Sequence, residues 1–418
     1  MIAIKKTVII GGGAAGIMAA VNATGENTAV TLIEKNDKLA RKVMITGKGR
    51  CNVTNNCDLQ TFIKNVPKNG NFLYSAFSRF SSADTMAFFE NEGVKLKTER
   101  GNRVFPVSDK AVDIVDALSS KVKKSGVRVE TGSAKRILVK DGCVYGVELS
   151  DGRVFLCDSL VIATGGKSYP LTGSTGDGYK LAADCGHTVT ELYPSLVPLE
   201  CHEGFCTALS GLALKNIRAS FYAEGNKKPM FSEQGELLFT HFGISGPLVL
   251  SASAHLRDNE NTKYYVDIDL KPALDEETLD KRLLRDFSSG LNKDFSNSLD
   301  ALLPKSLIPV IVKLSNIPPS EKVNQITREQ RRALIAVIKG LRLHITGKRP
   351  IEEAVVTSGG VSVKEINPNT MESKVVKGLY FAGEVIDVDA YTGGFNLQIA
   401  FSTGFVAGSS IGEKEETK

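Results

Sequence analysis

The feature that most constrains the fold is a short unit at the start of the chain, where an apolar run leads into a glycine-rich turn. The run from Thr7 to Ile10 predicts a strand, and glycines at positions 11, 13 and 16 follow it. In this G-x-G-x-x-G spacing the first glycine permits a tight turn and the second lets the backbone approach a pyrophosphate. The third lets a helix pack closely on the strand. The alternative is an ordinary glycine-rich turn between strand and helix.

An acidic residue stands at a suitable place after this turn. Glu34 closes the next apolar run, 18 residues after Gly16, which is near the distance needed to accept hydrogen bonds from a ribose diol. An acid here favours an unphosphorylated ribose. The strand, the turn and the acid together predict nucleotide binding.

A long polar loop follows directly. The segment from Arg41 to Asn55 carries four cationic side chains, Arg41, Lys42, Lys48 and Arg50. Such a loop is able to wrap a pyrophosphate and to offer hydrogen-bond donors to the edge of an isoalloxazine ring. The alternative is a solvated basic loop without a ligand.

A second glycine-containing segment near the other end of the chain is expected to serve the same ligand. Here Glu384 and Asp387 precede the pair Gly393-Gly394, which opens a predicted helix over 395–405. The two carboxylates suit ribityl hydroxyls, and the first N–H groups of the helix suit the negative charge of a reduced flavin. The alternative is a glycine-broken helix that packs on the sheet. Because two separate segments fit one cofactor, the sequence predicts FAD. Binding is expected to be non-covalent, because no His or Cys stands in a recognisable flavin-linkage motif.

The length of 418 residues predicts two or three domains. Helices are expected at 82–92 and 111–124, and strands at 127–139, 144–149 and 159–164. In the helix over 111–124, the predicted apolar face consists of Val112, Val115, Leu118 and Val122. Residues 191–273 change to short β runs, at 217–223, 236–239 and 264–270, and residues 274–345 change to helical patterns, at 277–287, 299–303, 308–314 and 329–341. The expected fold is therefore α/β: a Rossmann-like nucleotide-binding domain, formed by residues 1–190 and 346–418 and split by an inserted β domain and a helical insert.

The bulk properties argue against several other classes of protein. The formal net charge of +5 is spread without a basic block, and no run of about 18 uniformly apolar residues exists to span a bilayer. The seven cysteines are odd in number and form no Cys-x-x-Cys, which argues against a disulfide framework, a zinc ribbon and an iron–sulfur cluster. Cys201, His202 and Cys206 make at most half of a metal site, so no metal is expected. We expect a cytoplasmic protein that acts on a small molecule, without a nucleic-acid or membrane partner.

Over essentially its whole length the chain resembles a family of bacterial flavoproteins that includes aminoacetone-oxidase-like enzymes and the BaiN-like reductase of bile-acid dehydroxylation. The matching segments are 50–55, 357–361, 370–374, 382–389 and 392–398. The resemblance implies bound FAD, a split FAD domain of the two-dinucleotide-binding-domain type, and inserted β-barrel-like and helical domains. A wider likeness, carried by 163–166 and 173–178, is to fumarate-reductase and ketosteroid-dehydrogenase flavoproteins. The chain departs from the family pattern at Lys48, which interrupts an expected run of glycines.

The predicted function is that of an FAD-dependent oxidoreductase. The expected reaction is reduction of an activated C=C bond in a 3-oxo bile-acid- or steroid-like substrate. NAD(P)H is expected as a transient donor, because no second G-x-G-x-x-G marks a dedicated NAD(P) domain. The alternatives are an oxidase of small amines such as aminoacetone, which produces peroxide, and a flavin-bound regulatory or binding module. The catalytic acid is unknown; His241 and Tyr391 are candidates, each with a structural role as the alternative.

The candidate cofactor-binding residues come from the N-terminal unit, the polar loop, the strand ends and the C-terminal segment. They are Gly11, Gly13, Ala14, Ala15, Gly16, Glu34, Lys35, Lys42, Arg50, Cys51, Asn52, Ala134, Thr164, Gly165, Gly166, Gly383, Glu384, Asp387, Gly394, Asn396, Leu397 and Gln398.

Overall fold

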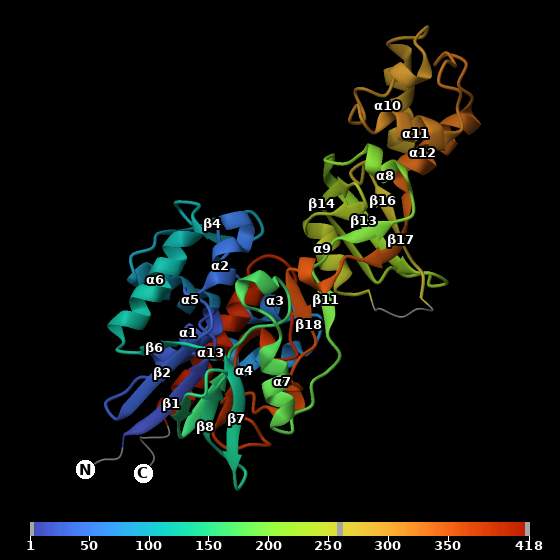
Figure 1. The fold of residues 1–418 in the computed structure, drawn as a ribbon. Coiled ribbons are helices and arrows are strands. Elements are labelled where there is room, and N and C mark those ends of the chain that lie inside the picture. Colours follow the sequence, from blue (N-terminus) through green and yellow to red (C-terminus); the bar gives the residue numbers. More distant parts are fainter. Residues whose placement is uncertain (1–3, 257–261, 414–418) are drawn as a thin grey trace. The chain divides into compact units, whose positions relative to one another are not determined.

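The chain folds into two compact units. The computed structural model describes residues 4–256 and 262–413 (Figure 1). Its contacts separate a discontinuous unit, Met1–Ser195 with Ile351–Lys418, from an inserted unit, Leu196–Pro350. Both ends of the chain therefore belong to the same unit, as the split domain in the sequence predicts. The four predicted domain limits differ in detail from these bounds and stay predictions.

A parallel sheet forms the centre of the discontinuous unit. Its strands stand in the order β19-β10-β1-β2-β6, and every neighbouring pair is parallel. Their bounds are β1 (Lys5–Ile10), β2 (Thr28–Glu34), β6 (Arg128–Thr131), β10 (Ser159–Ile162) and β19 (Leu379–Phe381). Nearly continuous apolar runs such as 8–10 and 160–162 are buried, as expected for strands covered on both faces. The predicted Rossmann-like α/β fold is confirmed.

Two helices from opposite ends of the chain pack against each other beside this sheet. They are α1 (Ala14–Asn22), which follows the glycine turn, and α13 (Phe395–Glu413), drawn next to it in Figure 1. Their approach depends on small residues: a Cβ built on Gly404 would lie 2.3 Å from the carbonyl oxygen of Ala15, and one on Gly408 would lie 2.4 Å from that of Ala19. The N-terminal and C-terminal segments are thus held side by side.

The other elements of the discontinuous unit surround this core. They are α2 (Arg41–Ile45), η1 (Thr46–Gly49), β3 (Thr54–Asn55), α3 (Leu59–Lys64), η2 (Gly70–Leu73), α4 (Tyr74–Arg79), α5 (Ser82–Asn91), β4 (Leu96–Glu99), β5 (Arg103–Pro106), α6 (Ala111–Lys124), β7 (Ala134–Lys140), β8 (Cys143–Leu149), β9 (Val154–Leu156), η3 (Pro170–Thr172), α7 (Asp177–Asp184), β11 (Tyr193–Ser195), η5 (Ile351–Glu353), β18 (Val356–Ser358), η6 (Val363–Glu365) and η7 (Gly383–Val385). Helix α6 has the predicted bounds, but Ile114 lies on its buried face and Val112 is 38% exposed. The expected strand over 127–139 is interrupted at Gly132 and Ser133, so that β6 and β7 belong to different sheets.

The inserted unit is a closed barrel with helices. The barrel order is β12-β15-β14-β13-β16-β17, and the side chains of Phe221, Phe239 and Val266 fill its interior. The strands are β12 (Leu199–Cys201), β13 (Ala213–Ala223), β14 (Phe231–Thr240), β15 (Gly243–Ser245), β16 (Tyr264–Asp269) and β17 (Leu341–Lys348). The helices are α8 (Phe205–Ala208), α9 (Pro247–Ser253), α10 (Glu276–Ser288), η4 (Phe295–Asn297), α11 (Ile308–Ser315) and α12 (Arg328–Lys339). The β-barrel-like and helical parts implied by the resemblance are both present.

Two sequence expectations in this unit were wrong. The predicted helix over 329–341 ends at Lys339, and β17 follows, because Leu341 and Leu343 are buried while Arg342 is exposed, which is the alternation of a strand. This strand pairs with β12 and β16 and closes the barrel. The segment 299–303 forms turns rather than a helix, since Pro304 disfavours helical geometry in the residue before it.

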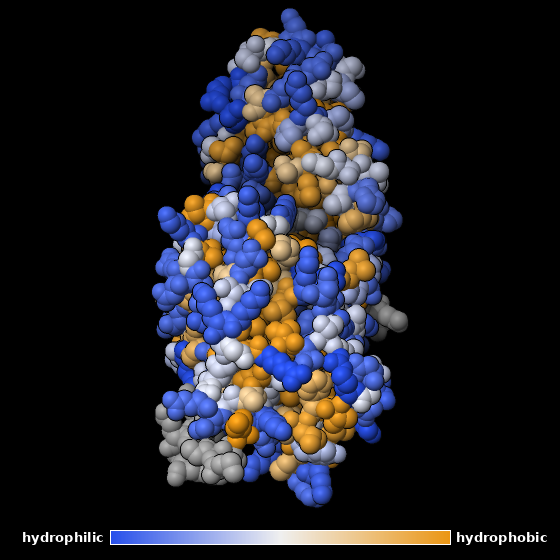
Figure 2. Space-filling view, turned by 60° about the vertical axis from the view of Figure 1, so that its left-hand side comes forward, coloured by the Kyte–Doolittle hydropathy of each residue, from blue (hydrophilic) through white to orange (hydrophobic). Residues whose placement is uncertain are grey.

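The surface of the described residues shows no feature of a membrane span or a metal site. No helix in the described part of the chain has the length and apolar character to cross a bilayer. Nor do its His, Cys, Asp and Glu side chains form a group of three or more that could hold a metal ion. On the face drawn in Figure 2, apolar side chains reach the surface in a band bordered by hydrophilic ones.

Candidate functional site

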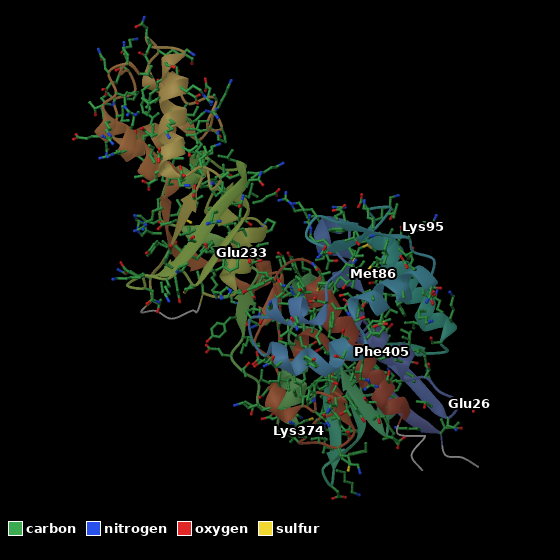
Figure 3. All side chains as sticks on the ribbon, turned by 180° about the vertical axis from the view of Figure 1, so that it is seen from behind. Glu26, Met86, Lys95, Glu233, Lys374 and Phe405 are labelled. Atoms are coloured by element: carbon green, nitrogen blue, oxygen red, sulfur yellow. The ribbon has the colours of Figure 1, made fainter. Side chains whose placement is uncertain are left out.

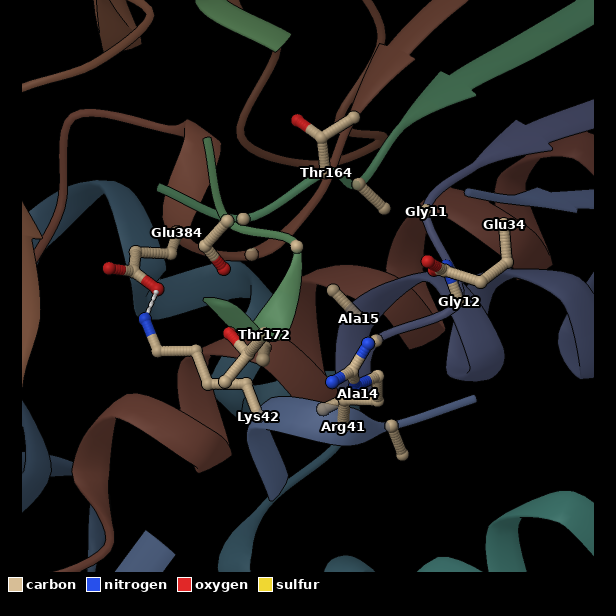
Figure 4. A pocket seen from close by; sticks show the side chains of 18 of the residues that line it. Gly11, Gly12, Ala14, Ala15, Glu34, Arg41, Lys42, Thr164, Thr172 and Glu384 are labelled. Atoms are coloured by element: carbon tan, nitrogen blue, oxygen red, sulfur yellow. Dashed lines mark hydrogen bonds and ion pairs between the residues drawn. The ribbon is translucent and has the colours of Figure 1, made fainter. Parts of the chain in front are cut away.

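A cleft opens where the strands of the parallel sheet end. Its lining comes from the residues that directly follow all five strands of that sheet (Figure 4). These residues are 11–15 after β1, Glu34 to Asn36 at the end of β2, 132–134 after β6, 163–165 after β10 and 382–384 after β19. The cleft measures about 1310 Å³, counting the space open to solvent. Ligands of open α/β sheets bind at this carboxyl edge.

The glycines of the first turn occupy distinct positions. Gly11 has φ +106°, and a Cβ on it would lie 2.4 Å from the carbonyl oxygen of Ala163. A Cβ on Gly16 would lie 1.8 Å from the carbonyl oxygen of Gly11, so helix α1 packs directly on the turn. A Cβ on Gly13 would meet nothing within 4 Å, since this glycine faces open space in the cleft. These positions fit the three roles that the spacing predicts.

The carboxylate of Glu34 is fixed by its neighbours. Its Oε2 accepts a hydrogen bond from the backbone N–H of Gly12 at 2.6 Å. Its Oε1 accepts from the backbone N–H and the side-chain amide of Asn36, at 2.8 and 2.7 Å. Glu34 is 9% exposed and lines the cleft. Because a carboxylate has about four acceptor positions and three are used, Glu34 keeps capacity for about one hydroxyl of a ribose.

Cations line the wall next to Glu34. They are Lys35, Lys38, Arg41 and Lys42, all within eight residues of that acid. Lys35 donates to Asp177 at 2.6 Å, which joins the end of β2 to the start of α7. Arg41 donates to the Asn36 side chain at 3.0 Å. A cluster of positive charge beside a glycine turn is suited to a pyrophosphate.

An ion pair joins the N-terminal and C-terminal segments across the cleft. The Nζ of Lys42 lies 2.7 Å from Oε2 of Glu384, as Figure 4 shows, although the two residues are 342 positions apart. Lys42 also donates to the hydroxyl of Ser168 at 2.7 Å. The other carboxylate oxygen of Glu384 accepts from the backbone N–H of Thr357 at 2.8 Å. These contacts place Glu384 on the wall of the cleft, where the sequence predicts an acceptor for ribityl hydroxyls.

The start of α13 forms the far end of the cleft. Asn396 and Leu397, in the first turn of this helix, line it. The first backbone N–H groups of a helix have no partner within it. The side chain of Asn396 accepts from the N–H of Ala390 at 2.9 Å and donates to its carbonyl at 2.7 Å, which braces the preceding segment.

The residues present fit a flavin dinucleotide. Thr164 lines the cleft, and its hydroxyl is buried toward Gly178 without a hydrogen-bond partner among the described residues. Open space lies at Gly13, where a diphosphate would approach the backbone. An acid for a ribose, cations for a pyrophosphate and the first turn of a helix for a flavin all belong to the lining of the cleft. FAD carries all three groups.

Most of the sequence-predicted residues come together in this cleft. Those that line it are Gly11, Gly13, Ala14, Ala15, Glu34, Lys35, Lys42, Ala134, Thr164, Gly165, Gly383, Glu384, Asn396 and Leu397. Gly16, Gly166 and Gly394 lie behind the lining and make room for it: a Cβ on Gly166 would lie 2.7 Å from Oε1 of Glu384, and one on Gly394 would lie 2.4 Å from the carbonyl of Thr54.

Gln398 has a different environment from the one expected. Its side chain is fully buried and does not line the cleft. Its Oε1 accepts from the hydroxyls of Thr54 and Thr85 at 2.6 and 2.8 Å, and its Nε2 donates to the carbonyl of Phe80 and to Ser402. All of its hydrogen-bonding capacity is used to hold α13 against β3, α4 and α5.

Four further predicted residues, Arg50, Cys51, Asn52 and Asp387, do not line the cleft. Asp387 pairs with Lys68 at 2.8 Å, and Arg50 pairs with Glu99 and Asp109, both at 2.5 Å. Cys51 is fully buried, and burial raises the pKa of its thiol to about 12, so it is not a ready nucleophile. Asn52 does not line the cleft, although its side-chain oxygen is buried without a partner among the described residues. Their roles toward the cofactor stay predictions.

The two candidate proton donors do not line the cleft. His241 is exposed on the turn between β14 and β15 in the inserted unit, where its ring contacts Phe242. Tyr391 is half-buried and lies in the segment just before α13; its N–H donates to the carbonyl of Asn65. Close to that segment, Asp389 is buried between the hydroxyls of Ser195 and Ser358, and burial raises the pKa of its carboxyl group.

The sequence reasoning missed several lining residues. Among them are Asn36, Lys38, Gly132, Ser133, Thr172, Gly173, Ser174, Asp177 and Val388. The run 173–178 carries a family resemblance in the sequence, and three of its residues, Gly173, Ser174 and Asp177, line the cleft. Gly132 and Ser133 follow the end of a strand, so the position of β6 in the sheet, had it been known, would have pointed to them.

Comparison with known proteins agrees with this architecture. A family model described as the HI0933-like protein Rossmann domain matches residues 5–410. The curated relatives include the 3-dehydro-bile acid delta(4,6)-reductase of Clostridium scindens, 31% identical over 415 residues that cover 97% of this chain and 98% of the relative. They also include the ribosomal RNA dihydrouridine synthase of Escherichia coli, 33% identical over 407 residues that cover 97% of each protein.

Among solved structures, the 3-ketosteroid delta1-dehydrogenase of Sterolibacterium denitrificans aligns with a TM-score of 0.53. It is 13% identical, and the alignment covers 98% of this chain and 99% of that one. At this identity the likeness concerns the fold alone. The wider likeness to ketosteroid dehydrogenases is confirmed at that level.

Proposed function

The chain belongs to the HI0933-like protein family and is an FAD-dependent oxidoreductase, and from this premise we propose that it reduces a carbon–carbon double bond conjugated with a carbonyl group. The observation that carries the proposal is the cleft at the edge of the sheet, in which Glu34 and the glycine turn stand at one end and the start of α13 at the other. When bound there, FAD supplies two-electron chemistry between a donor and an acceptor.

The residues of the chain bind and orient the cofactor in this proposal. Glu34 accepts from the ribose, Arg41 and Lys42 neutralise the pyrophosphate, and Glu384 accepts from the ribityl chain. The first N–H groups of α13 favour the negative charge of the reduced state.

We propose NAD(P)H as an electron donor that docks transiently. The sequence has one G-x-G-x-x-G turn, which we assign to FAD, and no second one for a dedicated NAD(P) domain.

The names of the relatives support the reaction class. One is named for reduction of a 3-dehydro-bile acid at delta(4,6) and the other for synthesis of dihydrouridine. Dihydrouridine is uridine whose C5=C6 bond, conjugated with the C4 carbonyl, has gained two hydrogens. Both names therefore describe addition of hydride and a proton across an activated double bond.

Our first candidate substrate is a 3-oxo bile acid or steroid, a small apolar molecule with a conjugated enone. It is supported by the 31% identity to the bile-acid reductase over nearly the full length of both chains. In this case the chain would act without a nucleic-acid partner, as the spread of charge along the sequence led us to expect. The seven free cysteines fit the reducing cytoplasm in which we place the reaction.

The second candidate is a uracil base in ribosomal RNA. It is supported by the 33% identity to the dihydrouridine synthase, which also extends over nearly all of both chains. This candidate requires that the expectation of no nucleic-acid partner be wrong. A flavin-bound module without catalytic activity is disfavoured, because the curated relatives are named as enzymes.

The test separates the electron donor from the acceptor. Purified protein with FAD is mixed with NADH or NADPH without oxygen, and bleaching of the flavin absorbance is followed. The reduced protein is then offered a 3-oxo-4-ene bile acid, ribosomal RNA isolated from a strain that lacks this chain, or buffer. We expect reduction by a nicotinamide and rapid reoxidation by one of the two acceptors, with the saturated product found by mass spectrometry.

Other outcomes would overturn the proposal. Reduction of the flavin by aminoacetone, with peroxide formed in air, would identify an amine oxidase instead. A flavin that neither acceptor reoxidises faster than buffer does would exclude both candidate substrates.

A further inference from the structure

The loop after α2 and the hairpin of β4 and β5 form a single surface around Phe105. The guanidinium carbon of Arg50 lies 4.1 Å from the centre of the Phe105 ring, and that of Arg103 lies 5.9 Å from it. A Cβ built on Gly47 would lie 3.4 Å from the same ring, so η1 packs on it as well. Two segments some fifty residues apart thus present their side chains together.

The charges on this surface are not balanced. The carboxylates of Glu99 and Asp109 are already engaged by Arg50, and Asp109 also pairs with Lys97 at 2.8 Å. Lys48, Arg100 and Arg103 remain, and none of these forms an ion pair with another described residue. We call these three residues the cation triad. Among the described residues, the side chain of Arg103 donates only to the backbone carbonyl of Arg100, at 3.1 Å, which leaves its guanidinium with donors to spare.

The backbone presents two members of the cation triad to solvent. Lys48 is exposed and has φ +59°, between two glycines that also have positive φ. A lysine in this left-handed conformation is less favourable than a glycine, and such strain is found more often where a side chain has a function. Arg100 is exposed at the hairpin turn, next to Gly101 and Asn102, which both have positive φ.

The surface is fixed to the end of the cleft where α13 begins. The side-chain amide of Asn55 donates to the carbonyls of Gly101 and Gly393, each at 3.0 Å. Gly101 belongs to the hairpin turn, and Gly393 stands two residues before α13. On the other side of the surface, Thr46, which lines the cleft, is two residues from Lys48. The triad therefore belongs to a surface that is joined to the segment before α13 and, through Thr46, to the lining of the cleft.

We propose that the cation triad binds an anionic group of the substrate, at a distance from the double bond that is reduced. The inference rests on the proposed function and specifies its substrate further: the acceptor carries a carboxylate or a phosphate. Guanidinium groups and an ammonium group without acidic partners are suited to either anion. A bile acid would supply the carboxylate and a ribonucleic acid the phosphates, and the experiment distinguishes these sources.

The test removes the three charges without shortening the side chains much. The variant K48Q/R100Q/R103Q is compared with K95Q/K123Q/K140Q, which removes three exposed lysines that have no ion pair with a described residue. Lys95, labelled in Figure 3, lies on the same hairpin but before β4, opposite the turn that carries Arg100. A third variant, K48R/R100K/R103K, keeps all the charges. FAD content, melting temperature and anaerobic reduction by NAD(P)H should be unchanged in all three proteins.

Turnover gives the first readout. For a pair of 3-oxo-4-ene steroids that differ only in a side-chain carboxylate or alcohol, the triad variant should raise KM for the acid by about ten-fold or more and leave KM for the alcohol unchanged. For ribosomal RNA, KM should rise and the slope of log affinity against log salt should fall by about 2. Whichever substrate, the steroid acid or ribosomal RNA, shows the raised KM identifies the source of the anion. The control variant should behave as wild type, and the charge-keeping variant should recover most of the affinity.

The proposed function and this inference fail in different ways. If wild type reduces either substrate and the triad variant keeps the same KM and salt slope, the reaction class stands and the triad is not an anion site. If wild type reduces neither, equilibrium binding of the steroid acid and of fluorescent RNA still tests the triad. Equal binding by wild type and the triad variant, or no binding by either, overturns the inference.

Discussion

The two ends of the cleft are built by different means. At the end where β1 and β2 stop, the contacts come from backbone geometry within a short stretch: Gly16 packs on Gly11, and Glu34 accepts from the N–H of Gly12. At the end where α13 begins, side chains join residues more than 300 positions apart, such as Lys42 with Glu384 and Thr54 with Gln398. Local spacing therefore specifies the first end, whereas the second exists only once the chain has folded.

The largest effect is expected from Gly16→Val at the locally specified end. The added Cβ would lie 1.8 Å from the carbonyl oxygen of Gly11, and two backbone segments would have to separate to admit it. We expect the free energy of unfolding to fall by about 3 kcal/mol and FAD to be lost. Thermal unfolding and the ratio of flavin to protein measure both effects.

Gly13→Ala is the matched control for that substitution. Its Cβ meets nothing within 4 Å, so the protein should keep its melting temperature, while the methyl group, placed in the cleft, weakens FAD binding. If Gly16→Val retained FAD at the wild-type ratio, the turn would not be the compact unit that the comparison requires.

A slightly smaller effect is expected at the other end from Gln398→Ala. The substitution removes the acceptor of the Thr54 and Thr85 hydroxyls in a buried site, and the carbonyl of Phe80 keeps only its hydrogen bond from Ser402. We expect a loss of about 2–3 kcal/mol in the free energy of unfolding. The reduction potential of the bound flavin should not change, because Gln398 does not line the cleft.

Asn396→Ala provides the contrast for this prediction. Its side chain braces the segment before α13, and the residue itself lines the cleft. We expect a smaller loss of stability than for Gln398→Ala and a change in the reduction potential. A potential that moves with Gln398→Ala but not with Asn396→Ala would reverse the assignment of the two residues.

The same difference explains what could be predicted from the sequence. Residues 11–15 of the turn and the acid Glu34 line one cleft, and the sequence pairs them because each depends on a fixed spacing along the chain. Gln398 was assigned to the cofactor, since nothing in its neighbourhood in sequence reveals the hydroxyls of Thr54 and Thr85. Arg50 was assigned likewise, and the pairing with Glu99 and Asp109 appears only once β3, β4 and β5 form a sheet.

The fold shows a parallel limit. The period of the apolar residues located α6 and the buried strands, but the strand β17 was taken as the end of a helix. The four residues after Gly340 alternate between buried and exposed. This alternation is too short to outweigh the helical periodicity of 328–339. Only its pairing with β12 and β16 identifies it, and these partners lie about 75 or more residues away.

An intermediate effect is expected from Glu34→Ala. Loss of a charge-assisted hydrogen bond to a ribose diol costs about 1.5–3 kcal/mol, so FAD affinity should fall roughly ten- to a hundred-fold. Titration of apoprotein with FAD, followed by flavin fluorescence, measures it. Asn36→Ala is the control, because it removes the side-chain amide that donates to Glu34 but keeps the backbone N–H donor and the carboxylate. Unchanged affinity in Glu34→Ala would mean that the carboxylate serves only to hold the N–H of Gly12.

The smallest effect concerns pH and again separates the two ends. His187 is buried behind β19, the strand that leads to Glu384; its ring nitrogens lie 3.2 Å from Glu365 and 2.8 Å from the hydroxyl of Ser373. Its ring also contacts Phe381, the last residue of that strand, edge to face. Burial lowers the pKa of His187 below its ordinary value of 6.5, and the nearby Glu365 carboxylate opposes this only in part. By contrast, no histidine lines the cleft among the described residues.

The sign of the effect follows from proton binding. Between the lowered pKa of folded His187 and 6.5, the unfolded chain binds more protons than the folded one, so stability rises with pH in that interval. This stability is therefore lost as the pH falls through 6.5, and the loss levels off below the pKa of folded His187.

In His187→Gln, which keeps a side chain able to reach Ser373, the difference in stability from wild type should depend on pH only within this interval. Melting temperatures of both proteins between about pH 5 and 8 test this. Because Gly16→Val acts through backbone packing, its destabilisation should not vary with pH in the same interval. If the melting temperatures of wild type and His187→Gln change in parallel with pH, His187 does not titrate in this interval. The contrast between a locally built end and a long-range polar end would then rest on the substitutions alone.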